Sequence, residues 1–160
     1  MRAQARNSLR DVRRYVAIRI ALAVCLAMAG SAHAELGGSA ASVMSEAQWA
    51  QANVQITSLA SYDVHEMHAP NGATVRQYLD RSGKVFGVAW RTSGPPDLRT
   101  VLGAYYARYL ALGATRIDLH HAALHSPELV VEVGGVLHAF GGRAYVPAHL
   151  PAGLSPSVIR

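Results

Sequence analysis

Apolar and polar positions alternate along three runs between residues 62 and 91, and turn-forming residues separate the runs. The separators are Pro-Asn-Gly at 70–72 and Asp-Arg-Ser-Gly at 80–83. Alternation with a period of two is typical of strands that bury one face. Asn-Gly favours a tight hairpin because both central residues of a type I′ turn need positive φ. The pattern therefore predicts a three-stranded antiparallel meander.

The two turns also predict which residues stand side by side, if Asn71-Gly72 forms a two-residue loop and residues 81–83 form a bulged turn. The expected pairs are His65 with Tyr78, Glu66 with Gln77, Met67 with Arg76, Tyr78 with Phe86, Arg76 with Val88 and Thr74 with Trp90. One face then collects His65, Met67, Tyr78, Phe86, Val88 and Trp90 and is expected to receive a helix. The other face collects Val64, Glu66, His68, Val75, Gln77, Gly87 and Ala89. In this register the Tyr78 hydroxyl is the expected partner of the His65 ring, and His68 faces outward.

A helical period follows the meander. Two prolines precede Asp97, and Gly113 follows an apolar run. The positions that recur at i, i+3 and i+4 are Leu98, Val101, Leu102, Tyr105, Tyr109 and Leu112, whereas Arg99, Tyr106 and Arg108 lie off this face. This spacing predicts a helix over about 97–112 with its tyrosines in the core.

The flanking segments give weaker patterns. Residues 35–61 open as a flexible stretch, and Ser45 and Gln48 have the spacing of a capping box for a short helix in which Trp49 packs onto the domain. Residues 114–127 fit either a short helix or an irregular strand. Residues 129–140 predict a second hairpin that turns at Gly134-Gly135 and carries His138 beside its apolar positions. The proline-rich residues 148–160 predict an extended tail lying on the domain.

Charge is concentrated at the start of the chain. The first 34 residues contain six arginines and one aspartate, which account for the whole net charge of +5. An arginine-rich start, an apolar run at 20–29 and Ala32-His33-Ala34 are typical of a signal peptide cleaved after Ala34. The apolar run is shorter than the roughly 20 residues that span a bilayer, so no retained membrane span is expected. An uncleaved anchor and lipidation at Cys25 are the less favoured alternatives.

Cleavage at this site would leave a neutral chain without cysteine, located in the periplasm or secreted. Such a chain has no disulfide and no thiol chemistry, and it offers no basic surface for nucleic acid. Neither a nucleophile elbow nor a phosphate-binding glycine loop is present. The charge pattern therefore favours an exported protein that does not bind nucleic acid.

Seven histidines remain after this cleavage, which raises the question of a metal site. His65 and His68 are three apart, so on one strand they point to opposite faces and cannot share an ion. His121 and His125 would share one helix face with Asp118, and two imidazoles with a carboxylate suffice for an open zinc or copper site. These three residues are the candidate metal ligands, although no cofactor is expected overall.

Two stretches, residues 62–109 and 129–153, resemble the family known as domain of unknown function 2844, small secreted proteins of Gram-negative bacteria. The matching positions are Tyr62, His65, Glu66, Gly83, Phe86, Val88, Trp90, Gly94, Pro95, Asp97, Leu98, Leu102, Gly103, Tyr105, Gly142, Arg143, Ala144, Tyr145 and Pro147. The family favours Gly-His-Met after the second turn, whereas here His138 stands two positions later. The resemblance implies no catalytic residue, substrate or cofactor.

The patterns together predict an α+β domain at 62–147, in which a meander and a C-terminal hairpin pack on one main helix. We expect a non-catalytic binding or accessory module that meets an envelope or secreted protein partner through an exposed apolar patch near Trp90 and residues 91–97. The candidate binding residues are Tyr62, His65, Glu66, Trp90, Arg91 and Asp97. The alternative is a hydrolase, metal-assisted or acid/base, that uses His65 with Glu66, or His121 with His125.

Overall fold

The computed structural model describes residues 35–160 apart from 50, 114 and 117–120, and without the side chains of 45–49, 115 and 116. The predicted signal peptide at 1–34 and the candidate ligand Asp118 lie outside this part. The helical elements are α2 (Ala40–Trp49), α3 (Leu98–Leu102), η1 (Gly103–Tyr105), α4 (Tyr106–Leu112), η2 (Pro147–His149) and η3 (Pro156–Val158). None of the helices described is long and apolar enough to cross a membrane.

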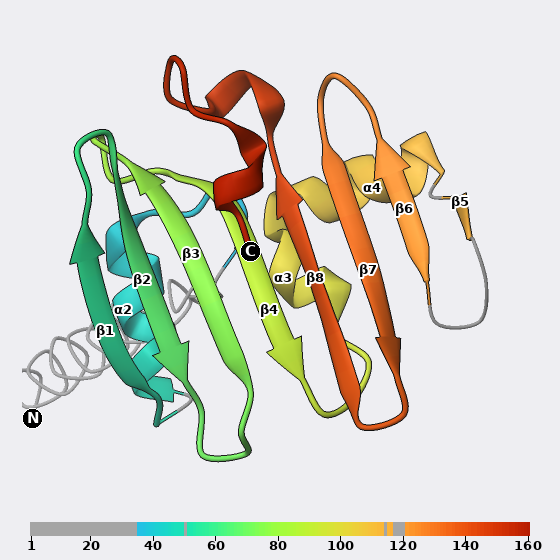
Figure 1. Cartoon of the computed structure of the whole chain (residues 1–160), viewed down its shortest axis with the longest axis horizontal. Helices are drawn as coiled ribbons and strands as arrows, with labels where there is room; N and C mark the ends of the chain where they lie inside the picture. Colours follow the sequence, from blue (N-terminus) through green and yellow to red (C-terminus); the bar gives the residue numbers. More distant parts are fainter. Residues whose placement is uncertain (1–34, 50, 114, 117–120) are drawn as a thin grey trace, which may run out of the picture. The chain divides into compact units, whose positions relative to one another are not determined.

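The described strands form one antiparallel sheet in the order β1-β2-β3-β4-β8-β7-β6-β5 (Figure 1). They are β1 (Asn53–Ser58), β2 (Tyr62–His68), β3 (Thr74–Asp80), β4 (Val85–Thr92), β5 (Thr115–Arg116), β6 (Ala122–His125), β7 (Val130–Val136) and β8 (Ala139–Tyr145). Strands β2 to β4 are the predicted meander, and the hairpin β7–β8 extends it because β8 pairs with β4. The α+β class is confirmed.

One side of the sheet, here called the helix face, packs against α2, α3, η1 and α4. The sheet contributes Met67, Val85, Val88, Trp90, Val131 and Ala144 to this core, and the helices contribute Val43 and Leu102. Every member of the apolar stripe predicted between Leu98 and Leu112 is buried or packed against this core. The predicted core role of the helix is therefore confirmed.

The predicted helix is not continuous. Asp97 caps the start of α3, and Gly103, with φ of 49°, caps its end after Leu102. The chain then passes through one 3-10 turn before α4 begins at Tyr106. Because the interruption changes the helical phase, Tyr106 packs against the core, contrary to the prediction, and the Arg99 guanidinium lies 5.1 Å from its ring centre.

The register predicted for β2 and β3 is wrong by one residue. The turn closes with hydrogen bonds from the Ala69 amide to the Ala73 carbonyl and from the Gly72 amide to the Ala69 carbonyl. Pro70 therefore joins Asn71 and Gly72 in a three-residue loop, and His65 stands opposite Gln77. A shift of one residue exchanges the faces of a paired strand. Gln77 and Val75 consequently lie on the helix face.

A β-bulge alters the next pairing. The predicted three-residue turn at 81–83 is confirmed by hydrogen bonds between Asp80 and Lys84 and between Gly83 and Asp80. The register then shifts, so that Leu79 pairs with Val85 but Tyr78 pairs with Gly87. The extra residue, Phe86, turns away from the helices together with Tyr78. The two aromatic side chains pack on the opposite side of the sheet from His65, and the predicted Tyr78 partner for His65 is wrong.

The turn of the second hairpin is also displaced. Val136 pairs with Ala139, so Leu137 and His138 form the loop and Gly134-Gly135 stay within β7. His138 adopts φ of 67° and is a turn residue, contrary to its predicted place beside the apolar positions of the strand. The displaced register sets Val131 opposite Ala144 in the core, and it leaves Leu137 with 77% of its surface exposed.

The segment before β2 is more ordered in its packing than predicted. Helix α2 begins after Ser39, whose side chain and that of Ser42 accept each other's backbone amides, so Ser45 lies inside the helix and does not start it. Leu36 is fully buried in the core, contrary to the expected flexible start. The side chain of Trp49 lies outside the described part of the chain.

The last residues, 147–160, form the second cover of the sheet and are here called the tail segment. They contain two 3-10 turns, η2 and η3, so the predicted extended tail is wrong in conformation although it lies on the domain. Ile159 is fully buried beside Tyr78, Phe86 and Ala89. The side of the sheet that carries this second core is here called the tail face (Figure 1).

The burial of Ile159 predicts that the tail segment contributes to global stability. Ile159→Ala should lower the free energy of unfolding by about 2–5 kcal/mol, because it removes buried carbon atoms and leaves a cavity. Leu137→Ala, in the exposed turn, should change it by less than about 0.5 kcal/mol. Urea unfolding followed by circular dichroism measures both, and equal effects of the two substitutions would show that the tail segment is not part of the folded core.

Candidate functional site

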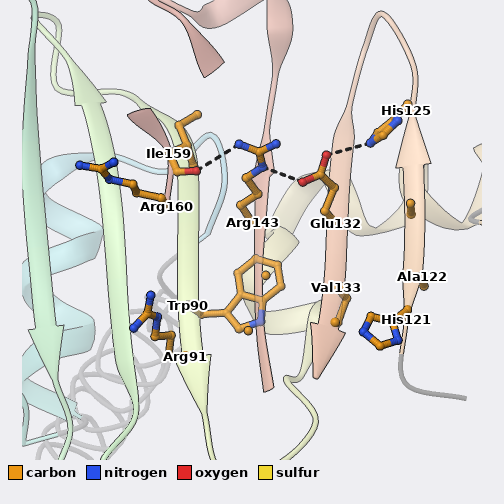
Figure 2. Close-up of a pocket in the computed structure, with 14 residues that line it drawn as sticks. Trp90, Arg91, His121, Ala122, His125, Glu132, Val133, Arg143, Ile159 and Arg160 are labelled. Atoms are coloured by element: carbon orange, nitrogen blue, oxygen red, sulfur yellow. Dashed lines mark hydrogen bonds and ion pairs between the residues drawn. The ribbon is translucent and has the colours of Figure 1, made fainter. Parts of the chain in front are cut away.

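The tail segment covers one half of the tail face, and the other half is hollowed. Two adjoining hollows of about 640 and 220 Å³ share Trp90, Arg91 and Arg160 in their lining. Together they are here called the tail-face groove. The larger hollow is also lined by His121, His125, Glu132 and Arg143 (Figure 2). The smaller hollow is also lined by Glu66, His68 and Arg76. A groove that gathers this many titratable groups is the strongest site candidate in the described residues.

A cluster of three charged or titratable side chains stands at one end of the groove. Glu66 on β2 faces Arg76 on β3 as a direct cross-strand pair. The Nε and Nη2 atoms of Arg76 donate to the two carboxylate oxygens of Glu66 at 2.8 and 3.2 Å. His68 lies on the same face, with its Nε2 atom 3.1 Å from Oε1 of Glu66. This bidentate geometry fixes the direction of the Arg76 guanidinium.

An equivalent cluster stands on the other side, across β4. Glu132 on β7 faces Arg143 on β8, and the Arg143 Nε donates to Glu132 Oε2 at 2.7 Å. The other oxygen, Oε1, lies 2.9 Å from Nε2 of His125 on β6 (Figure 2). The tail face therefore carries the arrangement histidine–glutamate–arginine twice, in both cases with a glutamate opposite an arginine on the next strand.

Both arginines also hold the tail segment. The Arg76 Nη1 donates to the Arg160 carbonyl at 2.9 Å, and the Arg143 Nη1 donates to the carbonyls of Pro156 and Ile159 at 3.3 and 3.4 Å. The Tyr78 hydroxyl donates to the same Arg160 carbonyl and accepts from the Arg160 amide. Charged donors make stronger hydrogen bonds than neutral ones. The two clusters thus fix the border between the covered half of the face and the groove.

The electrostatics of both clusters favour their charged forms. The hydrogen bonds from Arg76 lower the pKa of the Glu66 carboxyl, and those from Arg143 and His125 lower the pKa of the Glu132 carboxyl. In return, the glutamates raise the pKa of each arginine. Burial raises the pKa of the Tyr78 hydroxyl, which stays a neutral donor. Both glutamates therefore act as structural anions that are already neutralised within the fold.

Two arginines of the groove remain without such a partner. Within the described residues, neither the Arg91 nor the Arg160 guanidinium has a hydrogen bond or an ion pair. Both residues are exposed, and Figure 2 shows their guanidinium groups on the side of Trp90 away from His121. Two positive charges without a carboxylate in contact can bind an anion from outside.

Trp90 does not form the exposed patch that was predicted near it. It is only 3% exposed, and its ring lies on the helix face over Gly142, where an added Cβ would approach the ring to 2.4 Å. Its Nε1 is buried without a hydrogen-bond partner in the described residues. Exposed apolar side chains occur at Val136, the last residue of β7, and at Leu137 in the turn that follows it. The Trp90 ring therefore packs on the side of the sheet opposite the groove.

The first hydrolase alternative requires His65 and Glu66 in one site. The two residues are neighbours on β2, so their side chains point to opposite faces of the sheet. His65 lies on the helix face, 7% exposed, and its Nδ1 has no hydrogen-bond partner among the described residues. Burial lowers the pKa of this histidine, so its ring is neutral at physiological pH. Glu66 lies in the groove beside Arg76. The two side chains cannot act together on one substrate.

The second alternative and the metal site share one premise, a helix that carries His121 and His125. The structure contradicts it, because β6 begins at Ala122 and ends at His125. Along a strand, residues four apart are separated by about 13 Å, too far for one ion. His125 is bonded to Glu132, and the His121 ring lies over Gly134, where an added Cβ would come within 2.6 Å of it. Across the described residues, no three histidine, cysteine or acidic side chains could hold a metal.

Tyr62 and Asp97 have structural contacts. Tyr62 packs against the rings of Tyr78 and Phe86 in the tail-face core. The carboxylate of Asp97 accepts from the Arg99 amide and the Thr100 hydroxyl at the start of α3. Of the six candidate binding residues, Arg91 and Glu66 have side chains in the groove, Trp90 lies behind it, and the other three lie elsewhere.

Four residues of the groove, Arg76, Glu132, Arg143 and Arg160, are not among the candidate site residues predicted from the sequence. Glu66 and His68 are two apart on a predicted strand, so the sequence alone indicates that their side chains share one face. Their arginine partner depends on the register, and the predicted register paired Arg76 with Met67. The contribution of Arg160 depends on the path of the tail segment, which no local pattern specifies.

The chain belongs to the family described as Protein of unknown function (DUF2844), whose model matches residues 32–159. This confirms the resemblance found in the sequence. No curated protein and no solved structure matches the chain. The match covers the sheet, the helices and the tail segment up to Ile159, so it includes every residue that lines the groove except Arg160.

The lowered pKa values predict an acid-sensitive fold. A glutamate whose native pKa is depressed stabilises the fold above its unfolded pKa, about 4.3, and this contribution is lost as pH falls through the native value. Glu132→Gln should therefore flatten the decline in stability below about pH 4 and lower the stability at neutral pH. Urea unfolding at a series of pH values measures this, and Glu35→Gln, at the start of the described chain and away from the groove, is the control. A slope below pH 4 that Glu132→Gln leaves unchanged would contradict the assignment.

Proposed function

We propose that the protein is a non-catalytic binding module of the cell envelope that recognises an acidic segment of another envelope or secreted protein in the tail-face groove. The observation that carries the proposal is the pair of arginines, Arg91 and Arg160, which line an open groove without a partner among the described residues. Guanidinium groups bind carboxylates in a bidentate fashion. A segment with several acidic side chains is therefore the ligand that fits this chemistry best.

The form of the groove supports an extended ligand. Its floor is a sheet surface in which Gly141 carries no side chain, so the backbone of β8 can be approached closely there. Its sides carry the exposed rings of His68 and His125, whose Nε2 atoms are bonded to Glu66 and Glu132. The glutamates of both clusters are neutralised by Arg76 and Arg143, so they repel an acidic ligand less than free carboxylates would.

The proposed location in the envelope rests on the first 34 residues of the sequence. Their arginine-rich start, short apolar run and Ala32-His33-Ala34 have the form of a signal peptide. The rest of the chain has no cysteine and is neutral, which suits an oxidising compartment and a role without nucleic acid. The family match begins at residue 32, close to the proposed cleavage site.

The groove predicts charge-selective peptide binding. A fluorescein-labelled hexaglutamate peptide should bind the wild-type protein at low ionic strength, and fluorescence anisotropy measures its affinity. Arg91→Glu should weaken binding about tenfold, the equivalent of about 1.4 kcal/mol for one lost charge-assisted contact. A hexalysine peptide should not bind.

The matched control is Arg99→Glu, which makes the same charge change at α3, away from the groove. It should leave the affinity within about twofold, since an exposed charge at a distance is screened by salt. Equal weakening by the two substitutions, or no binding by the wild type, would overturn the proposed ligand. Folding of each variant is verified by its circular dichroism spectrum.

The export proposal predicts a defined N-terminus. When the full coding sequence is expressed in a Gram-negative host, the periplasmic fraction should contain a chain that begins at Glu35, as measured by intact mass and N-terminal sequencing. Ala34→Leu should block cleavage, since signal peptidase requires a small residue there. Recovery of a chain starting at Met1 from the cytosol of wild-type cells would refute export.

A further inference from the structure

Strand β1 (Asn53–Ser58) ends the sheet on one side of the described structure. All six of its residues pair with β2, and five of the six are exposed. The sequence Asn-Val-Gln-Ile-Thr-Ser contains no charge, no proline and no glycine, and the strand has no bulge. Natural proteins usually protect an edge strand with such features, because an unprotected edge pairs with another strand. The edge β1 therefore has the properties of a pairing surface.

The backbone geometry of β1 determines which of its groups face outward. The Leu59 amide donates to the Tyr62 carbonyl, so this pair is hydrogen-bonded at the turn into β2. Hydrogen-bonded and non-hydrogen-bonded pairs alternate along an antiparallel ladder. Thr57, Gln55 and Asn53 therefore direct their backbone groups to β2. The amides and carbonyls of Val54, Ile56 and Ser58 point away from the sheet.

The side chains add one apolar feature at the centre of this edge. Ile56 stands opposite His65 and so belongs to the helix face, yet 56% of its surface is exposed. A second strand laid along β1 would cover it. Because every side chain of β1 is uncharged, a strand of the same sequence meets no like-charge repulsion there.

From this geometry we infer that β1 pairs antiparallel with β1 of a second copy of the chain, around a two-fold axis that is perpendicular to the sheet and passes midway between the two copies of Ile56. This axis keeps the helix faces of both copies on the same side, so paired residues share a face. Ile56 stands opposite Ile56 of the partner subunit, and Val54 stands opposite Ser58 of the partner subunit. All three outward-facing positions then form hydrogen-bonded pairs, and the two isoleucines cover each other.

The interaction does not involve the tail-face groove, and it holds whether or not the proposed ligand is right. The contact is one strand of six residues, about 20 Å long, which is small for a permanent interface. A reversible dimer whose population rises with concentration is therefore expected. Sedimentation equilibrium of the protein, expressed from its full coding sequence, should show this monomer–dimer exchange.

The test uses cysteine cross-linking in a Cys25→Ala background, so that each variant has a single thiol. With Ile56→Cys, the two Cα atoms across the axis would be about 5.5 Å apart, within the range of a disulfide. With the matched control Ser58→Cys, the same atoms would be about 13 Å apart, beyond that range. Mild oxidation should cross-link the first variant many times faster than the second, as read from non-reducing gels.

A second variant tests the backbone pairing without a thiol. Ile56→Pro removes an outward-facing amide and leaves the hydrogen bonds between β1 and β2 in place, so it should abolish the dimer while the circular dichroism spectrum stays the same. Ile56→Val keeps the amide and should preserve the dimer. A strictly monomeric wild type, equal cross-linking of the two cysteine variants, or a dimer that survives Ile56→Pro would each overturn the inference.

Discussion

The organisation of the tail face depends on two arginines that connect the sheet to the end of the chain. Arg76 and Arg143 each take their direction from a glutamate on the neighbouring strand and donate to backbone carbonyls of the tail segment. Together with the hydrogen bonds between the Tyr78 hydroxyl and Arg160, these bonds hold Ile159 over the aromatic side chains of the tail face, which would otherwise expose a large apolar surface to water. The same bonds stop the cover halfway along the sheet. The groove exists because the cover ends there.

The two sides of one sheet thus serve different purposes. The helix face is covered by α2, α3 and α4 except at the edge strand β1, where Ile56 is exposed, and its polar members His65 and Gln77 are buried. The tail face is half core and half groove, with Arg91 available in its open half. In the proposed dimer, the axis perpendicular to the sheet would direct both grooves to the same side. A ligand with two acidic segments could then engage both, which raises its apparent affinity without any new contact.

Predictions from the sequence were most reliable where a structural feature depends only on residues close together in the chain. The alternation in β2 to β4, the apolar stripe from Leu98 to Leu112 and the turn at 81–83 all depend on neighbours in sequence, and the structure confirms them. The predictions failed where the local sequence was compatible with two turn positions or two strand registers. Gly134-Gly135 is a good turn signal, yet these glycines serve as strand residues. Phe86 could not be recognised as a bulge, since nothing in its own segment distinguishes the two registers.

The sequence by itself determined the class of the domain, its family, the main strands and the buried face of the principal helix, because periodicity and turn chemistry are local properties. Tertiary structure alone decided the site. The single-residue shift between β2 and β3 brought Arg76 opposite Glu66, and the register of β7 with β8 brought Arg143 opposite Glu132. These pairings, and the position of Arg160 beside them, depend on the packing of both faces of the whole sheet. The register of each strand pair depends on contacts between residues far apart in the sequence, so no short stretch of sequence specifies it.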